Sequence, residues 1–274
     1  MKGHTHSLSA GAAWVAVTST STAALGIAPQ ESAVVIVGSL LCAGGGMWPD
    51  IDHQDGTIAW SLPPISRWLC RGVGAISGGH RHATHSLFGV AVTAAIGFGM
   101  SLLVIDVHGR SIAIGGGIMA LLLTAFAVKV FGIGSGVASK KSLLGGVLSS
   151  PLGPWIIALT TAGLATRFMG YRWTWLTLAL TLGALVHCIG DALTVEGVPW
   201  LWPFHPKTPK VLTAIPVVGS LTKWMWMPNG YFRLPLLGEV GSVREKVFSI
   251  LLAAYWLYMI VFELTRVAGV TVLP

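Results

Sequence analysis

Charged side chains are scarce in this chain of 274 residues. Asp, Glu, Lys and Arg make up 10% of the sequence, whereas soluble proteins carry roughly 25%. So few charges cannot cover a water-exposed surface, and a hydrophobic content of 53% excludes an intrinsically disordered chain. Together with a mean hydropathy of +0.73, these values predict a polytopic membrane protein.

Cysteine is also rare, and the three cysteines are too far apart in the sequence to form a known motif. Cys42, Cys70 and Cys188 form no C-x-x-C pair, which excludes both a disulfide framework and a thiolate zinc site. The net charge of +7 would suggest nucleic acid as the partner of a soluble protein. Spread between apolar runs, it indicates anionic lipid headgroups instead, so we expect membrane lipids and no nucleic acid as partners.

Apolar runs of membrane-spanning length dominate the sequence. We expect an all-α bundle of about seven spans, with six or eight as alternatives, because backbone groups in hydrocarbon must be satisfied within each segment. The expected spans are residues 10–28, 33–48, 87–105, 111–133, 143–165, 173–193 and 247–267. Residues 1–274 are expected to form a single membrane-embedded domain.

Positive charge is divided unevenly between the two ends of such a bundle. With the N-terminus inside, twelve Lys and Arg residues lie on one side and four on the other. An excess of Lys and Arg marks the cytoplasmic side, so we expect a cytoplasmic N-terminus. Eight of the nine histidines, and all aspartates except Asp106, lie on or near that same side.

Two of the polar clusters precede or follow the first two spans. Thr5-His6 lies before the first span, where the threonine is a candidate helix cap that would put His6 in the first turn. Asp50 and Asp52 follow a run of glycines, residues 44–46, that permits close helix approach. We expect both carboxylates on one face of an extended segment, where two buried like charges repel unless a cation neutralises them.

The remaining clusters lie before the third span and at the end of the sixth. Thr84-His85 repeats the Thr-His pair, with Thr84 again a candidate helix cap, and His80 and Arg81 lie just before it. Arginine binds phosphate or carboxylate through two parallel hydrogen bonds. His187 and Asp191 are four residues apart and therefore share one face of a helix.

These side chains exceed the needs of one tetrahedral metal site. Each also has a structural interpretation, as an interfacial polar residue, a solvated acidic turn or a His–Asp pair. Nitrogen and oxygen donors without thiolate suit Zn, Mn or Fe, and two ions about 3.5–4 Å apart would share a bridging carboxylate. The candidate ligands of one or two divalent ions are His6, Asp50, Asp52, His53, His80, His85, His187 and Asp191.

The order of these motifs resembles that of the YdjM-like family of bacterial inner-membrane proteins. The matching segments are Thr5-His6 and residues 49–53, 80–86, 187–198 and 202–204. The resemblance implies an inner-membrane, metal-dependent hydrolase. A distant likeness of that family to zinc-dependent phospholipase C and P1 nuclease implies a phosphoester substrate. Where the family usually has glycine this chain has His82, which is either an extra ligand or a neutral change.

Residues 196–246 form the longest stretch that is not expected to span the membrane. Tryptophans and prolines alternate there with six basic residues, a composition typical of the headgroup region. We expect this segment to cover the polar cluster from the membrane surface, although an ordinary interfacial loop has the same composition. Glu245 is a candidate further ligand or general base.

The leading hypothesis is therefore a membrane hydrolase in which metal-activated water attacks the phosphoester of a lipid or lipid-linked substrate. Its candidate catalytic residues are Asp52, Arg81 and Glu245. One alternative is a metal-ion or proton-coupled transporter, because ionisable residues within membranes often mark ion pathways. Another is a non-catalytic protein that a metal merely stabilises.

Overall fold

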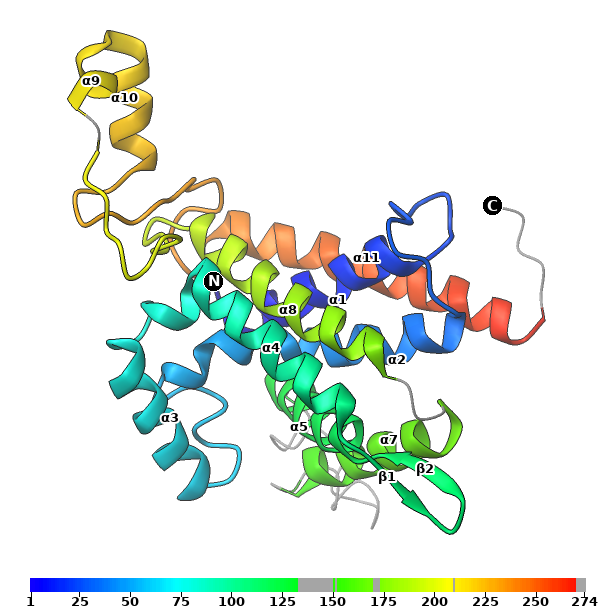
Figure 1. Ribbon diagram of the computed structural model, residues 1–274. Helices are drawn as coiled ribbons and strands as arrows, with labels where there is room; N and C mark the ends of the chain where they lie inside the picture. The colour runs from blue at the N-terminus through cyan, green and yellow to red at the C-terminus, as the bar shows by residue number, and fades with distance from the viewer. Residues whose placement is uncertain (133–149, 151, 170–172, 209, 270–274) are drawn as a thin grey trace.

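The fold is a helical bundle (Figure 1). The computed structural model describes residues 1–132, 150, 152–169, 173–208 and 210–269. Helix α1 (Gly3–Thr18) packs against α2 (Ser32–Gly45), α8 (Thr174–Ala192) and α11 (Val243–Val267). Helix α4 (Leu87–Leu102) packs on α8, and α5 (Ile114–Val130) packs on both α2 and α7 (Gly153–Phe168).

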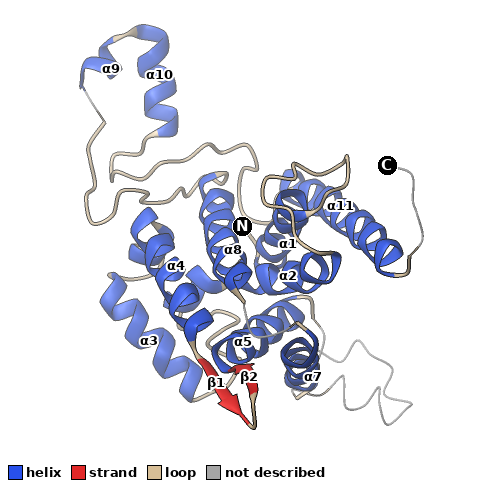
Figure 2. Ribbon diagram, turned by 45° about the vertical axis from the view of Figure 1, so that its right-hand side comes forward, coloured by secondary structure: helices blue, strands red, loops and turns tan. Residues whose placement is uncertain are grey.

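Shorter elements lie around this bundle. The 3₁₀ helices η1 (Trp48–Asp52) and η2 (Ala83–His85) flank α3 (Ile65–Ser77) in the sequence. Strands β1 (Val104–Val107) and β2 (Arg110–Ala113) form an antiparallel hairpin in which Val104 pairs with Ala113. Helices α9 (Lys210–Ala214) and α10 (Pro216–Met225) project away from the bundle (Figure 2).

Glycine allows α2 to lie very close to two neighbouring helices. A Cβ atom at Gly44 would fall 2.0 Å from the backbone oxygen of Leu123 in α5, and one at Gly183 of α8 would fall 2.6 Å from the backbone carbon of Gly45. Only residues without a side chain permit such approach. The structure thus confirms the close helix contact expected from the glycine run after residue 43, and this contact brings the end of α2 against the middle of α8.

Three helical stretches among the described residues are long and apolar enough to cross a membrane. They are Ser32–Asp52, which joins α2 to η1, Thr174–Ala192 and Val243–Val267. Helices α4 and α5 are apolar but shorter. The protein is mostly helical with membrane-spanning character, and the seven spans stay a prediction.

Several expected boundaries are wrong. The first span was expected at residues 10–28, but α1 ends at Thr18 and residues 19–31 form turns. The expectation of an all-α chain missed the β1–β2 hairpin. Each strand has only four residues and adjoins or overlaps an expected membrane span, so its residues were assigned to the apolar runs on either side. Residues 143–149 and 151 of the fifth expected span lie outside the described residues.

The local structure around the polar motifs also differs from expectation. Thr5 is not a cap, since it lies inside α1. Ser86, not Thr84, caps α4, and its side chain accepts a hydrogen bond from the amide of Gly89 at 3.1 Å. Asp50 and Asp52 lie on a 3₁₀ helix and not on an extended segment.

Candidate metal centre

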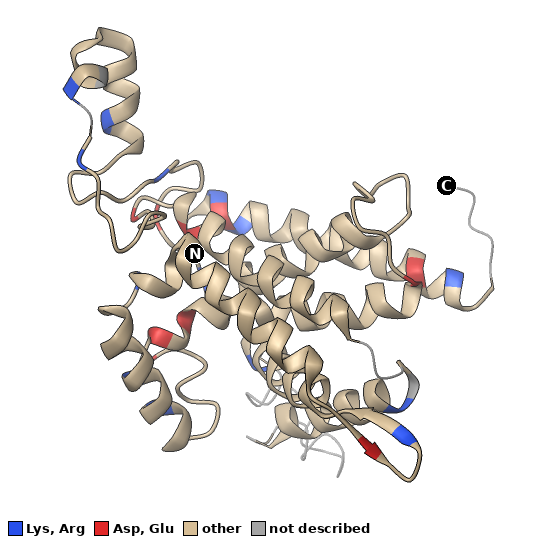
Figure 3. Ribbon diagram, in the orientation of Figure 1, with Lys and Arg blue, Asp and Glu red and all other residues tan. Residues whose placement is uncertain are grey.

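Four separate parts of the chain bring histidines and aspartates to one end of the bundle. His6 comes from the first turn of α1, Asp50 and Asp52 from η1, His85 from η2, and His187 and Asp191 from the end of α8. Figure 3 shows that acidic residues gather around this end of the bundle, near the N-terminus. Three overlapping groups of potential metal donors result: His6, His187 and Asp191; Asp50, His85 and His187; and Asp52, His80 and His85.

At the centre, two imidazole nitrogens face two carboxylates. The Nε2 atoms of His85 and His187 are 3.1 Å apart. Each lies 3.5 Å from Oδ1 of Asp50 and 3.6 Å from Oδ2 of Asp191. Tetrahedral zinc with bonds of 2.0–2.2 Å keeps its ligand atoms about 3.3–3.6 Å apart. The spacings within the group of Asp50, His85 and His187 therefore suit one small divalent cation, while Asp191 belongs to the neighbouring group with His6 and His187.

The ring orientation of His187 makes its Nε2 a metal donor. Its Nδ1 donates a hydrogen bond to the backbone oxygen of Gly46 at 2.6 Å. A neutral imidazole that carries its proton on Nδ1 presents a lone pair at Nε2. The lone pair of His187 at Nε2 thus faces Nε2 of His85 and the oxygens of Asp50 and Asp191, where it is placed to accept a proton from His85 or to bind a cation.

Asp52 holds His85 in place from the opposite side. One Asp52 oxygen accepts hydrogen bonds from the Thr84 hydroxyl and from the backbone amide of Arg81, the latter at 3.2 Å, and lies 3.5 Å from Nδ1 of His85. Burial alone would lower the pKa of His85, but hydrogen bonds to Asp50 and Asp52 raise that pKa to about 9. The two carboxylates thus stabilise positive charge between them.

Asp191 joins the central atoms to His6 and Arg81. Its Oδ1 lies 3.2 Å from Nε2 of His6, accepts a hydrogen bond from Nη2 of Arg81 at 3.2 Å, and contacts the amino group of Met1 at 2.5 Å. The ring of His6 stacks on that of His187 at 3.7 Å, and the Nδ1 atom of His6 is buried without a hydrogen-bond partner. An unpartnered buried nitrogen beside this centre is a further potential donor.

His80 and His53 lie at the outer edge of the centre. Nδ1 of His80 donates to the second oxygen of Asp52 at 2.8 Å, and the side chain is 36% exposed. The ring of His53 packs on that of His80 at 4.5 Å, while its Nδ1 accepts from the amide of Asp55. His80 therefore belongs to a donor group, whereas His53 belongs to none of the three.

The other sequence candidates take supporting positions. Both oxygens of Glu245 accept backbone hydrogen bonds, from Lys2 and from Gly241, each at 2.6 Å, so this carboxylate fixes the start of α1 and joins no donor group. Arg81 pairs with Glu196 at 2.5 Å as well as with Asp191. His82 packs edge-on against the ring of Tyr231.

Part of the 196–246 segment does reach the centre. The hydroxyl of Tyr231 donates to the backbone oxygen of Arg81 at 3.1 Å, and the oxygen of Trp200 accepts from the amide of Leu87. Sequence reasoning missed Tyr231, Glu196 and the hydroxyl of Thr84 as neighbours of the centre. Only Thr84 had a signal, its place beside His85, and the cap assigned to it was wrong.

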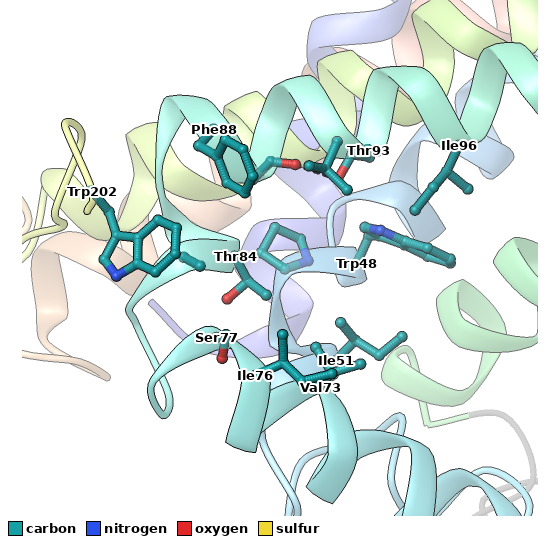
Figure 4. Close-up of a pocket in the computed structure, with 14 residues that line it drawn as sticks. Trp48, Ile51, Val73, Ile76, Ser77, Thr84, Phe88, Thr93, Ile96 and Trp202 are labelled. Atoms are coloured by element: carbon teal, nitrogen blue, oxygen red, sulfur yellow. Dashed lines mark hydrogen bonds between the residues drawn. The ribbon is translucent and has the colours of Figure 1, made fainter.

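Two cavities adjoin the centre on either side of α3. One, of about 410 Å³, is lined by polar groups that include Asp52, His53, Arg71 and His80. The other, of about 260 Å³, is lined almost entirely by apolar side chains (Figure 4).

Comparison with known proteins identifies one family. A family model described as "YdjM inner membrane protein" matches residues 1–139 and 142–267. No curated protein and no solved structure matches the chain. The distant likeness to phospholipase C and P1 nuclease therefore stays a prediction.

Proposed function

This chain belongs to the YdjM inner membrane protein family, and we propose that it is a metal-dependent hydrolase that cleaves a phosphoester of a lipid or lipid-linked substrate. The observation that carries the proposal is the convergence of the Nε2 atoms of His85 and His187 on Asp50 and Asp191 within 3.5–3.6 Å. Donor sets of neutral imidazole and carboxylate with an accessible side are typical of catalytic rather than structural zinc sites.

The cofactor is one or two divalent ions, with Zn favoured and Mn or Fe as alternatives. Such an ion supplies a Lewis acid for a phosphoryl oxygen and lowers the pKa of water. Asp50, His85 and His187 would hold the first ion, next to the group formed by His6, His187 and Asp191. The group of Asp52, His80 and His85 would hold a second, or else would position His85 from outside.

The chain's own residues supply the remaining chemistry. His80 is half-exposed beside the polar cavity and is oriented by Asp52, so it is placed to accept a proton from water and to pass it to solvent. Arg81 presents its guanidinium next to Asp191 and would bind the substrate phosphate through two parallel hydrogen bonds. In the proposed orientation this end of the bundle faces the cytoplasm.

Metal analysis combined with a phosphoester panel tests the proposal. The protein is purified in lipid nanodiscs, reloaded with Zn²⁺, Mn²⁺ or Fe²⁺, dialysed, and assayed on soluble phosphomonoesters and phosphodiesters and on phospholipids. We expect stoichiometric metal and hydrolysis that a chelator abolishes. Asp50→Asn should lose both, whereas Asp106→Asn, which changes an exposed carboxylate of the β1–β2 hairpin, should keep both. Clearly substoichiometric metal in the parent protein would refute the proposal.

Ion transport is the competing function. It requires polar groups that lead from the centre to the far end of the bundle, where buried Glu263 contacts Ser19 at 2.5 Å and Arg266 at 3.6 Å. Among the described residues, the core between these ends is built from apolar side chains such as Trp14, Leu41 and Leu180. Metal uptake into proteoliposomes without hydrolysis of any phosphoester would favour the transporter.

A purely structural metal is distinguished by Asp52. In a metal-stabilised scaffold, chelation of the metal would lower the melting temperature of the protein. Asp52→Asn would then have no effect on hydrolysis, because the scaffold has no hydrolytic activity to lose. In the proposed hydrolase the same substitution removes the group that orients His80 and His85, so turnover falls even with metal bound.

A further inference from the structure

The apolar cavity lies between η1, α3 and α4 (Figure 4). Its wall consists of aromatic rings and aliphatic side chains, among them Trp48, Phe88 and Trp202 and the aliphatic residues Ile51, Val73 and Ile96. Ser77, Thr84 and Thr93 are the polar side chains among its lining residues. A concave apolar site with a few convergent polar groups is typical of ligand pockets, and this composition suits hydrocarbon.

The cavity adjoins the metal centre through the chain neighbours of two donor residues. Its lining includes Pro49, which precedes Asp50, and Thr84, which precedes His85. The hydroxyl of Thr84 donates to Asp52. A molecule whose apolar part fills the cavity would therefore have its polar end beside the donor groups.

The rim of the cavity is continuous with the apolar outer surface of the protein. Ile76 is 86% exposed and Phe88 is 53% exposed, and both also line the cavity. They lie on α3 and on the apolar helix α4. In an inner-membrane protein such a surface faces lipid, so an occupant would enter sideways from the bilayer, whose hydrocarbon consists of acyl chains.

The polar cavity lies on the other side of α3 and shares no lining residue with the apolar one. Val73 and Ile76 of α3 line the apolar cavity, whereas Arg71 and Gly74 of the same helix line the polar one. Asp52 and His80 are among the lining residues of the polar cavity. An apolar and a polar cavity therefore adjoin the metal centre on the two sides of α3.

From this arrangement we infer that the apolar cavity binds one acyl chain of a membrane phospholipid whose phosphodiester lies at the metal centre and whose headgroup occupies the polar cavity. A cavity of about 150 Å³ takes one benzene ring, so 260 Å³ accommodates a segment of one chain and not two. The inference rests on the proposed function for what happens to the phosphodiester, but chain binding itself does not require catalysis.

Two tryptophan substitutions on α4 separate the cavity from the rest of the lipid-facing surface. Val92 lines the cavity, so Val92→Trp fills it. Ala91 is exposed on the same helix but is not among the lining residues, so Ala91→Trp is the matched control. Ile96→Trp is a second filling variant in case the first does not fold, as judged by gel filtration and thermal melting.

The first measurement is photo-crosslinking in nanodiscs with a phospholipid that carries a diazirine on one acyl chain. We expect crosslinks at Val73 and Ile96 in the parent and in Ala91→Trp, and a loss of about tenfold or more in Val92→Trp, because the indole displaces buried methylene groups of the chain and the loss of about two of them already lowers affinity by that factor. Equal labelling of these positions in all variants would overturn the inference. Labelling by a polyprenyl phosphate probe instead of the phospholipid would also overturn it.

The second measurement tests the same variants for hydrolysis of phospholipids and of a soluble phosphodiester without acyl chains. We expect Val92→Trp to lose only phospholipid hydrolysis and Ala91→Trp to lose neither. If phospholipid hydrolysis is equal in both variants, the acyl-chain assignment fails and the proposed function stands. If the parent hydrolyses nothing but its crosslinks still depend on Val92, the proposed function fails and chain binding stands.

Discussion

At the scale of single residues, the candidate centre depends on atoms that hold the ligands as much as on the ligands themselves. The backbone oxygen of Gly46 accepts a hydrogen bond from Nδ1 of His187 and so keeps the proton on that nitrogen, and Asp52 orients the ring of His85. Partners of this kind typically change metal affinity 10–100-fold when removed. Several groups around Asp191, including His6 and Arg81, have this supporting geometry.

His6 offers the sharpest single-residue prediction because a matched control lies two positions away. We expect His6→Ala to weaken metal binding by roughly 10–100-fold, since it removes the ring that stacks on His187 and contacts Asp191. His4→Ala changes an exposed side chain of the same helical turn and should leave the affinity unchanged. Isothermal titration with Zn²⁺ measures both, and equal affinities would show that His6 does not belong to the centre.

The sequence predicted much of this chemistry and missed its supports for a physical reason. His6, Asp50, Asp52, His80, His85, His187 and Asp191 were identified because ionisable side chains beside apolar spans require partners, and the structure brings them together. The carbonyl of Gly46 carries no signal in the sequence, because every residue has one. Which oxygen faces which ring depends on packing.

At the scale of elements, glycine-mediated contact between α2 and α8 sets the geometry of the centre. Gly183 lies one helical turn before His187, and a Cβ there would meet the backbone of Gly45 at 2.6 Å. Any displacement of α8 would therefore move His187 away from Gly46 and Asp50. The register of the two helices, and not one hydrogen bond alone, positions the imidazole.

We expect Gly183→Ala to lower the free energy of unfolding by about 1–3 kcal/mol, as overpacking does, and to reduce bound metal. Gly99→Ala on α4 is the control, because a Cβ at Gly99 meets nothing within 4 Å. It should keep the metal and gain slightly in helix stability. Thermal melting and metal analysis of the two variants provide the comparison, and equal metal content would argue against the role of this contact.

The positions of two helices were predicted well because a long apolar run covers nearly the whole of each. Expected spans 173–193 and 247–267 lie close to α8 and α11. The first span was displaced because hydropathy alone extended it through the turn residues after Thr18. Helix α3 was not predicted, because an amphipathic helix between two spans lacks the long apolar run by which spans are found.

At the scale of the whole molecule, the bundle separates two polar ends across an apolar middle. The candidate centre lies at the end near the N-terminus, while the turns of residues 19–31 and buried Glu263 lie at the other. The Lys and Arg distribution predicts that the centre faces the cytoplasm. Which side of the membrane the centre faces must therefore be measured on the protein in its membrane.

Cysteine labelling in spheroplasts tests this orientation. The native Cys42, Cys70 and Cys188 are buried, so new exposed cysteines report the topology. Leu25→Cys, in the turns after α1, should react with a membrane-impermeant maleimide in intact spheroplasts. Gln54→Cys, beside the candidate centre, should react only after permeabilisation. The reverse pattern would place the centre on the periplasmic side.

Helix α3 has one further consequence for the protein in its membrane. It is the shared wall of both cavities, and Ile65, Trp68 and Leu69 on its outer surface are exposed. An amphipathic helix of this kind binds the membrane surface with a strength that depends on curvature and on lipid composition. The lipids around the protein therefore bear on how firmly the wall between the two cavities is held at that surface.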